Sequence, residues 1–150
     1  MVRFEDLVDP AARETLAPLD EGAAHRVARR RQRHDHGLAV EAAMRAYAVK
    51  LEENPDAWGL VGLLHDFDYE QNQTEDTHLH VGCRILRERG WPEEIVRAVV
   101  SHGWGICTDV KPESDMEKVL YAIDELTGLV VTSALVRPSK SVMDMKAKSV

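Results

Sequence analysis

The stretch LLHDFDYE, residues 63–70, carries a histidine and two aspartates directly after an apolar helical run. His65 follows Val61 by four positions, so both side chains lie on the same inward stripe of the helix. Adjacent helical residues point about 100° apart, so His65 and Asp66 can serve one centre only where the helix ends. The polar residues 68–76 predict such an end just after the pair.

The rest of the chain predicts an all-α bundle of five or more core helices. Apolar residues recur at helical spacing, and no run alternates between apolar and polar residues. Capping residues, prolines and glycines set the predicted boundaries. The predicted helices lie within residues 10–31, at 37–53, from Asn54-Pro55 to about Asp68, at 77–90, from Pro92 to His102 and from Ser114 onward, with a loop at 103–113.

Two of these helices supply most of the predicted core. Ser114-Asp115-Met116-Glu117 has the spacing of a capping box, so it should start the last long helix. Apolar residues at helical spacing then mark the inward faces. The core candidates are Val40, Ala43, Met44, Tyr47 and Leu51 in the helix at 37–53, and Leu120, Ile123, Leu126 and Val130 in the last helix.

Length and composition predict one domain over residues 1–150, with its core at about 30–137. The polar tail 138–150 has two readings, a poorly ordered end or the cut edge of a longer chain. No run of about 18 apolar residues predicts a membrane span, and the first residues do not resemble a secretory signal. Cys83 and Cys107 form no CxxC pair, which favours free thiols and a cytoplasmic location.

The formal net charge of -7 argues against an extended nucleic-acid-binding face. It does not exclude a small anionic substrate, because bound cations dominate the local field of a site. A basic stretch, which contains Arg26, Arg29, Arg30, Arg31 and Arg33, runs into His36. It is either a solvated helix face or a phosphate-steering patch, with Arg29, Arg30 and Arg33 as the candidates for substrate contact.

Polar side chains on several inward helix faces predict a metal site. One buried histidine is commonly a hydrogen-bonded core residue, because an unpaired buried polar group is costly. Several histidines and aspartates on separate helices are better explained by coordination, since imidazole and carboxylate suit divalent transition metals. The inward residues of this kind are His36, His65, His102 and Asp124.

His78 is a further candidate, because it begins the predicted helix at 77–90. Gly82 follows one turn later and would let a neighbouring backbone or a ligand approach closely. His80 should face away from the site, and His25 and His34 are expected to be solvated.

In chain order these residues form the pattern H…HD…H…H…D, which resembles the HD-domain superfamily of metal-dependent phosphohydrolases, in particular its small single-domain bacterial members. The resemblance covers about residues 30–137. It implies a helical bundle that hydrolyses a phosphomonoester or phosphodiester, often of a nucleotide. The segments that carry it are HGLAVEA (36–42), LLHDFDYE (63–70), HLHVG (78–82), VVSHG (99–103) and YAIDELTG (121–128).

The resemblance also implies a ligand set. His36, His65, Asp66 and Asp124 would hold a first ion, and His78 and His102 a second, with Asp66 bridging. One or two divalent ions of iron, manganese, nickel or zinc are expected, with a small phosphorylated substrate. The chain departs from two variants of the superfamily. Phe67-Asp68-Tyr69 stands where one variant has Ile-Gly-Lys, and the glycine-tyrosine-proline signature of cyclic-dinucleotide phosphodiesterases is missing.

The expected chemistry is attack by metal-activated water, with Asp66 and Asp68 as the catalytic candidates. Asp68 either orients a ligand or water, or is a solvent-exposed carboxylate at the helix end. Trp104, in the 103–113 loop, either forms a lid or packs. Two other functions stay open: diiron oxygenase chemistry within the same superfamily, and a non-catalytic, metal-stabilised ligand-sensing domain.

Overall fold

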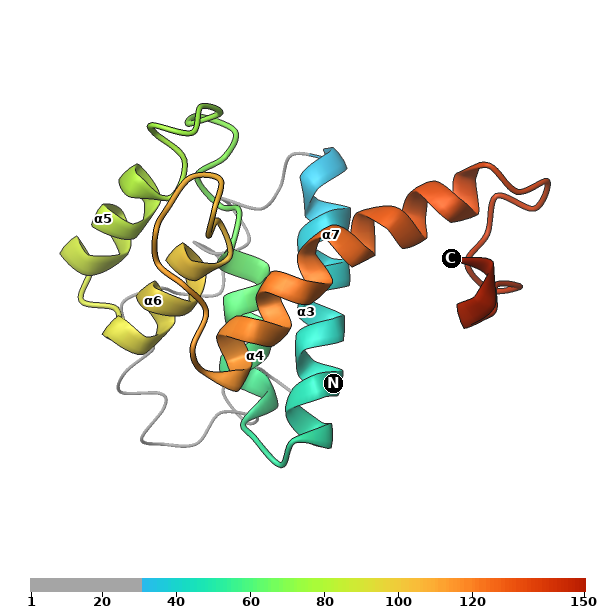
Figure 1. Ribbon diagram of the computed structural model, residues 1–150, viewed down its shortest axis with the longest axis horizontal. Helices are drawn as coiled ribbons and strands as arrows, with labels where there is room; N and C mark the ends of the chain where they lie inside the picture. The colour runs from blue at the N-terminus through green and yellow to red at the C-terminus, as the bar shows by residue number, and fades with distance from the viewer. Residues whose placement is uncertain (1–30) are drawn as a thin grey trace.

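The computed structural model describes residues 31–150, which form five α-helices and a final 3₁₀ turn. No strand occurs among them, so the all-α prediction is confirmed. The predicted helix within 10–31 and the candidates Arg26, Arg29 and Arg30 lie outside the described residues, as does the side chain of Arg33. The elements are α3 (Arg31–Lys50), α4 (Pro55–Leu64), α5 (His80–Glu88), α6 (Glu93–Ser101), α7 (Asp115–Leu135) and η2 (Ala147–Ser149) (Figure 1).

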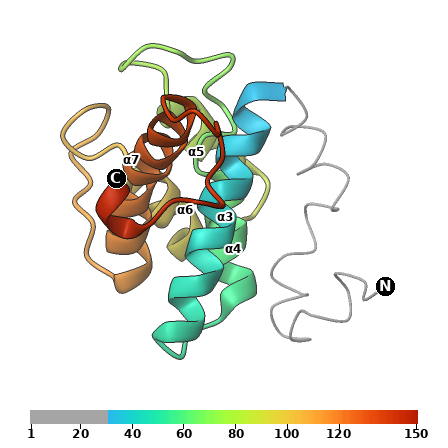
Figure 2. The same ribbon diagram turned by 90° about the vertical axis from the view of Figure 1, so that its right-hand side faces the viewer.

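Helices α3 and α4 pack along each other and carry the start of the site (Figure 2). Asn54 caps α4, because its side chain accepts the backbone N–H of Asp56 at 2.9 Å. Gly62 lets the two helices approach closely: a Cβ there would lie 3.0 Å from backbone atoms of Glu41. The end of α4, and with it His65, is therefore pressed against α3.

The inward face of α3 is narrower than predicted. Val40 and Met44 are buried and Ala43 packs against the core, as expected, and Ala48 continues the stripe one turn later. Tyr47 is 40% exposed, and Leu51 lies in the turn after the helix and is exposed as well. Both assignments were wrong. The buried stripe follows positions i, i+4 and i+8, which puts Tyr47 at its edge.

Helix α7 crosses α3, and its second half extends beyond the other helices (Figure 1). The predicted capping box is present, because Ser114 accepts the N–H of Glu117 and the Glu117 carboxylate accepts the N–H of Ser114. Leu120 and Ile123 are buried as predicted. Leu126 is 46% exposed, so its core assignment was wrong: at this turn of α7 the side that faces α3 carries Thr127, which contacts His36.

Helix α5 is shorter than the predicted helix at 77–90. It begins at His80, because Leu79 has a positive φ of 67° and interrupts the helix. Gly90, with φ 77°, provides the predicted left-handed stop after α5. Pro92 is the N-cap residue of α6 rather than part of its first turn.

The residues after α7 fold into a turn that ends in η2, with an ion pair of 3.2 Å between Arg137 and Asp144. None of the helices in residues 31–150 is long and apolar enough to cross a membrane.

Candidate metal centre

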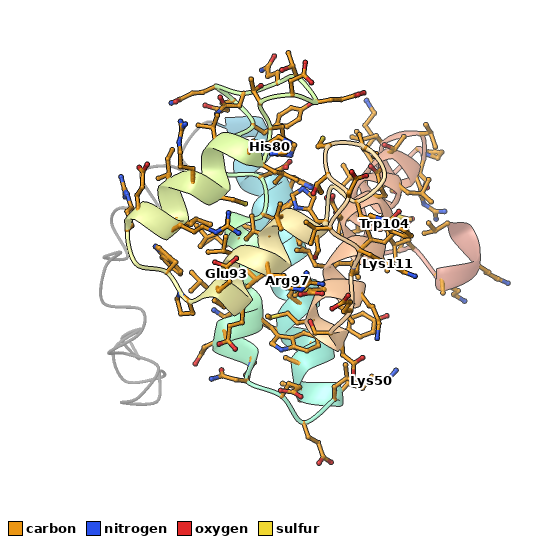
Figure 3. The ribbon with its side chains drawn as sticks, turned by 60° about the vertical axis from the view of Figure 1, so that its left-hand side comes forward. Lys50, His80, Glu93, Arg97, Trp104 and Lys111 are labelled. Carbon is orange, nitrogen blue, oxygen red and sulfur yellow. The ribbon has the colours of Figure 1, made fainter. Side chains whose placement is uncertain are left out.

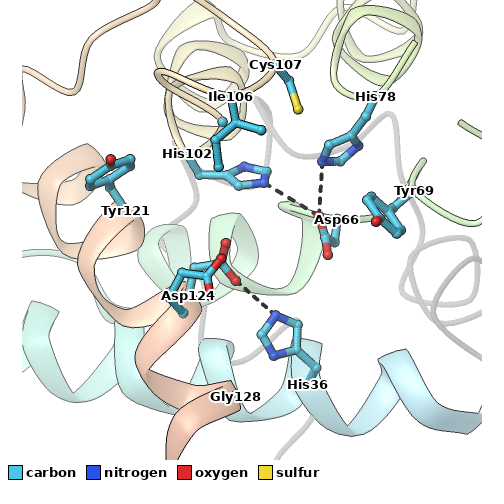
Figure 4. A pocket seen from close by; sticks show the side chains of 12 residues that line it. His36, Asp66, Tyr69, His78, His102, Ile106, Cys107, Tyr121, Asp124 and Gly128 are labelled. Carbon is cyan, nitrogen blue, oxygen red and sulfur yellow. Dashed lines mark hydrogen bonds and ion pairs between the residues drawn. The ribbon is translucent and has the colours of Figure 1, made fainter. Parts of the chain in front are cut away.

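Five of the six predicted ligands line one cavity of about 620 Å³ (Figure 4). The sixth, His65, is fully buried beside Asp66 and Asp124. Most of the six lie where a helix begins or ends, and these positions let adjacent residues turn toward one centre. His36 comes from the second turn of α3, His65 and Asp66 follow α4, His78 precedes α5, His102 follows α6 and Asp124 comes from the middle of α7.

One group of ligand atoms surrounds the carboxylate of Asp124. His36 Nε2 lies 3.0 Å from Asp124 Oδ1, and His65 Nε2 lies 3.3 Å from the same oxygen. Asp66 Oδ2 is 3.8 Å from His65 Nε2. The ligand atoms of His36, His65 and Asp66 all lie within 4.8 Å of one another, close enough to share one ion.

A second group surrounds the other oxygen of Asp66. His78 Nε2 lies 3.3 Å from Asp66 Oδ1, and His102 Nε2 lies 3.5 Å from it (Figure 4). These three residues also form a cluster whose ligand atoms lie within 4.8 Å of one another. Asp66 therefore belongs to both groups, with Oδ2 toward His65 and Oδ1 toward His78 and His102.

All four imidazoles are tied by Nδ1, which leaves Nε2 to face the carboxylates. Carbonyl and carboxylate oxygens only accept, so an Nδ1 beside them donates. Thr127 gives its own hydroxyl proton to Asp124 O, so its oxygen accepts from His36. The four bonds are His65 to Gly62 O at 2.7 Å, His102 to Val99 O at 2.6 Å, His78 to Asp68 Oδ1 at 3.0 Å and His36 to Thr127 Oγ1 at 3.2 Å.

This donor set fits a divalent transition metal. An Nδ1–H held by an oxygen acceptor leaves Nε2 with the lone pair that coordinates, as in known metal-binding histidines. His65 Nε2 is buried and makes no well-oriented hydrogen bond within the described part of the chain, although Asp124 Oδ1 lies 3.3 Å away. Such a buried polar atom is costly unless something binds it. Four imidazoles and two carboxylates are ligands that iron, manganese, nickel and zinc accept.

The charges of the site respond to the same contacts. Burial opposes ionisation of Asp66, but hydrogen bonds from His102 and His78 outweigh it and hold its pKa well below the usual value. Burial likewise opposes ionisation of Asp124, but the nearby His36 and His65 rings lower its pKa. Burial lowers the pKa of His78, but Asp66 and Asp68 raise it to about 9. A divalent cation that binds these side chains would compete with protons for them.

Asp68 does not line the cavity and lies behind His78. Its side chain is 3% exposed and accepts hydrogen bonds from His78 Nδ1 and from the backbone N–H groups of Leu79 and Gly82. The reading as a solvent-exposed carboxylate was wrong, and the reading as a group that orients a ligand is supported. Gly82 admits this carboxylate, because a Cβ there would lie 2.7 Å from Asp68 Cγ.

His80 stays outside the cavity, as predicted. It is exposed, and its Nε2 lies 3.0 Å from the carbonyl oxygen of Cys107. Helical phase does not explain this placement, since His78 precedes α5 and only His80 belongs to it.

The 103–113 loop is packed against α6 and α7. The Trp104 ring centroid lies 5.8 Å from that of Tyr121, and Lys111 Nζ lies 5.5 Å from the Trp104 ring (Figure 3). Arg97 on α6 pairs with Glu113 and with Glu117, each at 3.0 Å. These contacts favour the packing role of Trp104 over a lid.

Several cavity residues were not predicted from the sequence. Of those on α7, Tyr121 and Gly128 lie three residues before and four after Asp124, so helical spacing could have found them, whereas Glu125 lies one residue on and could not be found this way. Those in the 103–113 loop carried no such signal. Among the described residues that line the cavity there is no lysine or arginine. The unpredicted lining residues are Tyr69, Ile106, Cys107, Tyr121, Glu125 and Gly128 (Figure 4).

Comparison with known proteins agrees with this geometry. The family model described as "HD domain" matches residues 33–129, which is more than half of the chain and includes all six ligands. No curated protein and no solved structure shows significant similarity to the chain. HD domains bind divalent metals through histidine and aspartate side chains of the kind that meet here. By its sequence and its fold, the chain belongs to the HD-domain family.

Proposed function

We propose that this protein is a phosphohydrolase that uses two divalent ions to cleave a phosphomonoester or phosphodiester. The observation that carries the proposal is the position of Asp66 between two ligand groups. Its Oδ2 faces His65, and its Oδ1 faces His78 and His102. A carboxylate shared in this way is suited to bridging two ions, and paired ions are well suited to displacement at phosphorus.

Each ion would be held by its own group of residues. His36, His65, Asp66 and Asp124 would hold one ion, and Asp66, His78 and His102 the other. When bound, the ions supply Lewis-acid stabilisation of phosphoryl oxygens and lower the pKa of bound water toward ~7. Asp66 and Asp124 stay ionised and balance the positive charge. The Nδ1 hydrogen bonds hold each imidazole in a fixed orientation, so the ligands need little rearrangement on binding.

The cavity wall suggests the kind of substrate. Tyr69, Ile106 and Tyr121 give it an apolar and aromatic surface, and Glu125 adds a negative charge on the α7 side. Because no lysine or arginine lines the described part of the cavity, the phosphoryl group would be bound mainly by the ions. This favours a small ester whose leaving group is aromatic or apolar, such as a nucleoside, over a highly charged polyphosphate. Arg29, Arg30 and Arg33 remain candidates for phosphate steering.

The test is hydrolysis by metal-free protein reconstituted separately with Mn²⁺, Fe²⁺, Ni²⁺ and Zn²⁺. The substrate panel contains aryl phosphates, aryl phosphodiesters, nucleoside monophosphates and cyclic nucleotides. We expect turnover with at least one ion, its loss in His65→Ala and Asp66→Ala, and its retention in His80→Ala, the matched histidine outside the cavity. Oxygen uptake by the iron form without hydrolysis would favour the oxygenase. Tight metal binding without either activity would favour the sensing domain.

A further inference from the structure

A strained turn lies immediately before α5 and carries His78. The backbone N–H of His80 donates to the carbonyl of His78 at 2.8 Å, which closes a γ-turn centred on Leu79. Leu79 has φ 67° and ψ -38°, a conformation that L-residues rarely adopt. Its side chain is fully buried. Strained residues of this kind persist only where the surrounding contacts hold them.

Asp68 supplies those contacts with a single carboxylate. Its Oδ2 accepts the N–H of Leu79 at 3.1 Å and the N–H of Gly82 at 2.9 Å. Its Oδ1 accepts Nδ1–H of His78 at 3.0 Å. One buried group therefore fixes both the backbone of the turn and the imidazole that the turn presents.

His78 differs in this respect from the other three histidines. His65 and His102 donate to backbone carbonyls three residues earlier in the chain, so their orientation follows from their own helices. His36 donates to a threonine hydroxyl on α7. Of these four histidines, only His78 donates to a carboxylate, and that carboxylate also accepts backbone N–H groups of the turn that carries His78.

We propose that Asp68 is the positioning residue of the second metal ion: it holds the strained turn at Leu79 and the ring of His78, and so decides whether the second group of ligands is occupied. This inference rests on the metal centre proposed above. Asp68→Asn should abolish this positioning role while keeping the size of the side chain. An amide has one acceptor oxygen and a donor NH₂, so it cannot accept from His78 and also from the two backbone N–H groups.

The experiment is a Mn²⁺ titration of metal-free protein, followed by elemental analysis and electron paramagnetic resonance. Wild type should bind two ions per chain and give the spectrum of a magnetically coupled pair. Asp68→Asn should keep one tightly bound ion, give the six-line spectrum of isolated Mn²⁺, and bind a second ion about 10- to 100-fold more weakly, as expected when an outer hydrogen bond to a ligand is lost.

Glu117→Gln is the matched control. Glu117 is also a buried carboxylate that accepts backbone N–H groups, but it caps α7 and contacts no metal ligand. Its variant should melt at a lower temperature and still bind two coupled ions. Gly82→Ala tests the same idea with Asp68 intact, because the added Cβ would displace the carboxylate. It should weaken the second site as Asp68→Asn does.

The outcomes separate this inference from the proposed function. If wild type binds no Mn²⁺, the metal centre itself is wrong. If wild type binds two ions and Asp68→Asn binds both with unchanged affinity, the role of Asp68 is wrong while the metal centre stands. Equal weakening of both sites in Asp68→Asn would show general destabilisation and overturn the inference. If Asp68→Asn does not fold, wild-type affinity for the second ion in Gly82→Ala overturns it.

Discussion

At the scale of single residues, the site depends on what lies behind each ligand. An imidazole can coordinate through either nitrogen, and the hydrogen bond at one nitrogen decides which is free. The partners behind the ring are a carbonyl for His65 and His102, a carboxylate for His78 and a hydroxyl for His36. Substitution of the two side-chain partners, Asp68 and Thr127, should therefore change metal affinity without removing a ligand.

Thr127→Val tests this at the first ion. The valine keeps the shape of the side chain but loses the hydroxyl that accepts Nδ1–H of His36 at 3.2 Å. We expect about 10- to 100-fold weaker binding of one ion, measured by titration calorimetry with Mn²⁺. Thr132→Val, at an exposed position on the same helix, is the control and should bind as wild type does. Unchanged affinity in Thr127→Val would show that the hydroxyl does not orient His36.

His78→Ala and His102→Ala test the second ion. Each should lower the bound metal by about one ion per chain and leave the first site occupied. Because the second ion would stabilise charge that develops in the transition state, kcat should fall more than KM rises. If both variants keep the full metal count, His78 and His102 contact substrate or transfer protons instead, and a mononuclear site replaces the dinuclear one.

At the scale of elements, periodicity predicted the ligands better than it predicted where helices end. The inward phases of His65, His102 and Asp124 follow from local spacing, and the structure brings these residues together. The start of α5 did not follow, because the turn at Leu79 depends on Asp68, which lies eleven residues earlier. The exposure of Leu126 was also missed, because the face of α7 that meets α3 carries Asp124 and Thr127, which both contact His36.

The close packing of α3 on α4 gives a prediction for stability. Gly62→Ala would place a Cβ 3.0 Å from backbone atoms of Glu41, which cannot move without shifting α3. We expect a loss of about 1–3 kcal/mol in the free energy of unfolding, measured by urea denaturation. Gly128→Ala is the control, because nothing lies within 4 Å of its Cβ. It should be neutral or stabilising by up to about 1 kcal/mol, since alanine favours a helix. Equal losses in both variants would contradict the packing argument.

At the scale of the whole molecule, the ligands link segments that are far apart in the sequence. His36 and Asp124 are 88 residues apart, and the ends of α4 and α6 lie between them. An ion that binds only the folded chain stabilises it by mass action, by about 2.7 kcal/mol at a free concentration of 100 times Kd. The melting temperature should therefore rise with added Mn²⁺ and fall with a chelator. Asp66→Ala should show neither change, and an equal response in Asp66→Ala would place the stabilising ion elsewhere.

The most direct measurement counts the ions that wild type and Asp66→Ala bind in the same Mn²⁺ titration, with elemental analysis of the gel-filtered proteins. Among the described residues, Asp66 is shared by both ligand groups, with Oδ2 toward His65 and Oδ1 toward His78 and His102. We predict two ions per chain for wild type and almost none for Asp66→Ala. A wild-type protein that binds no ion, or an Asp66→Ala variant that still binds two, would contradict the shared metal centre.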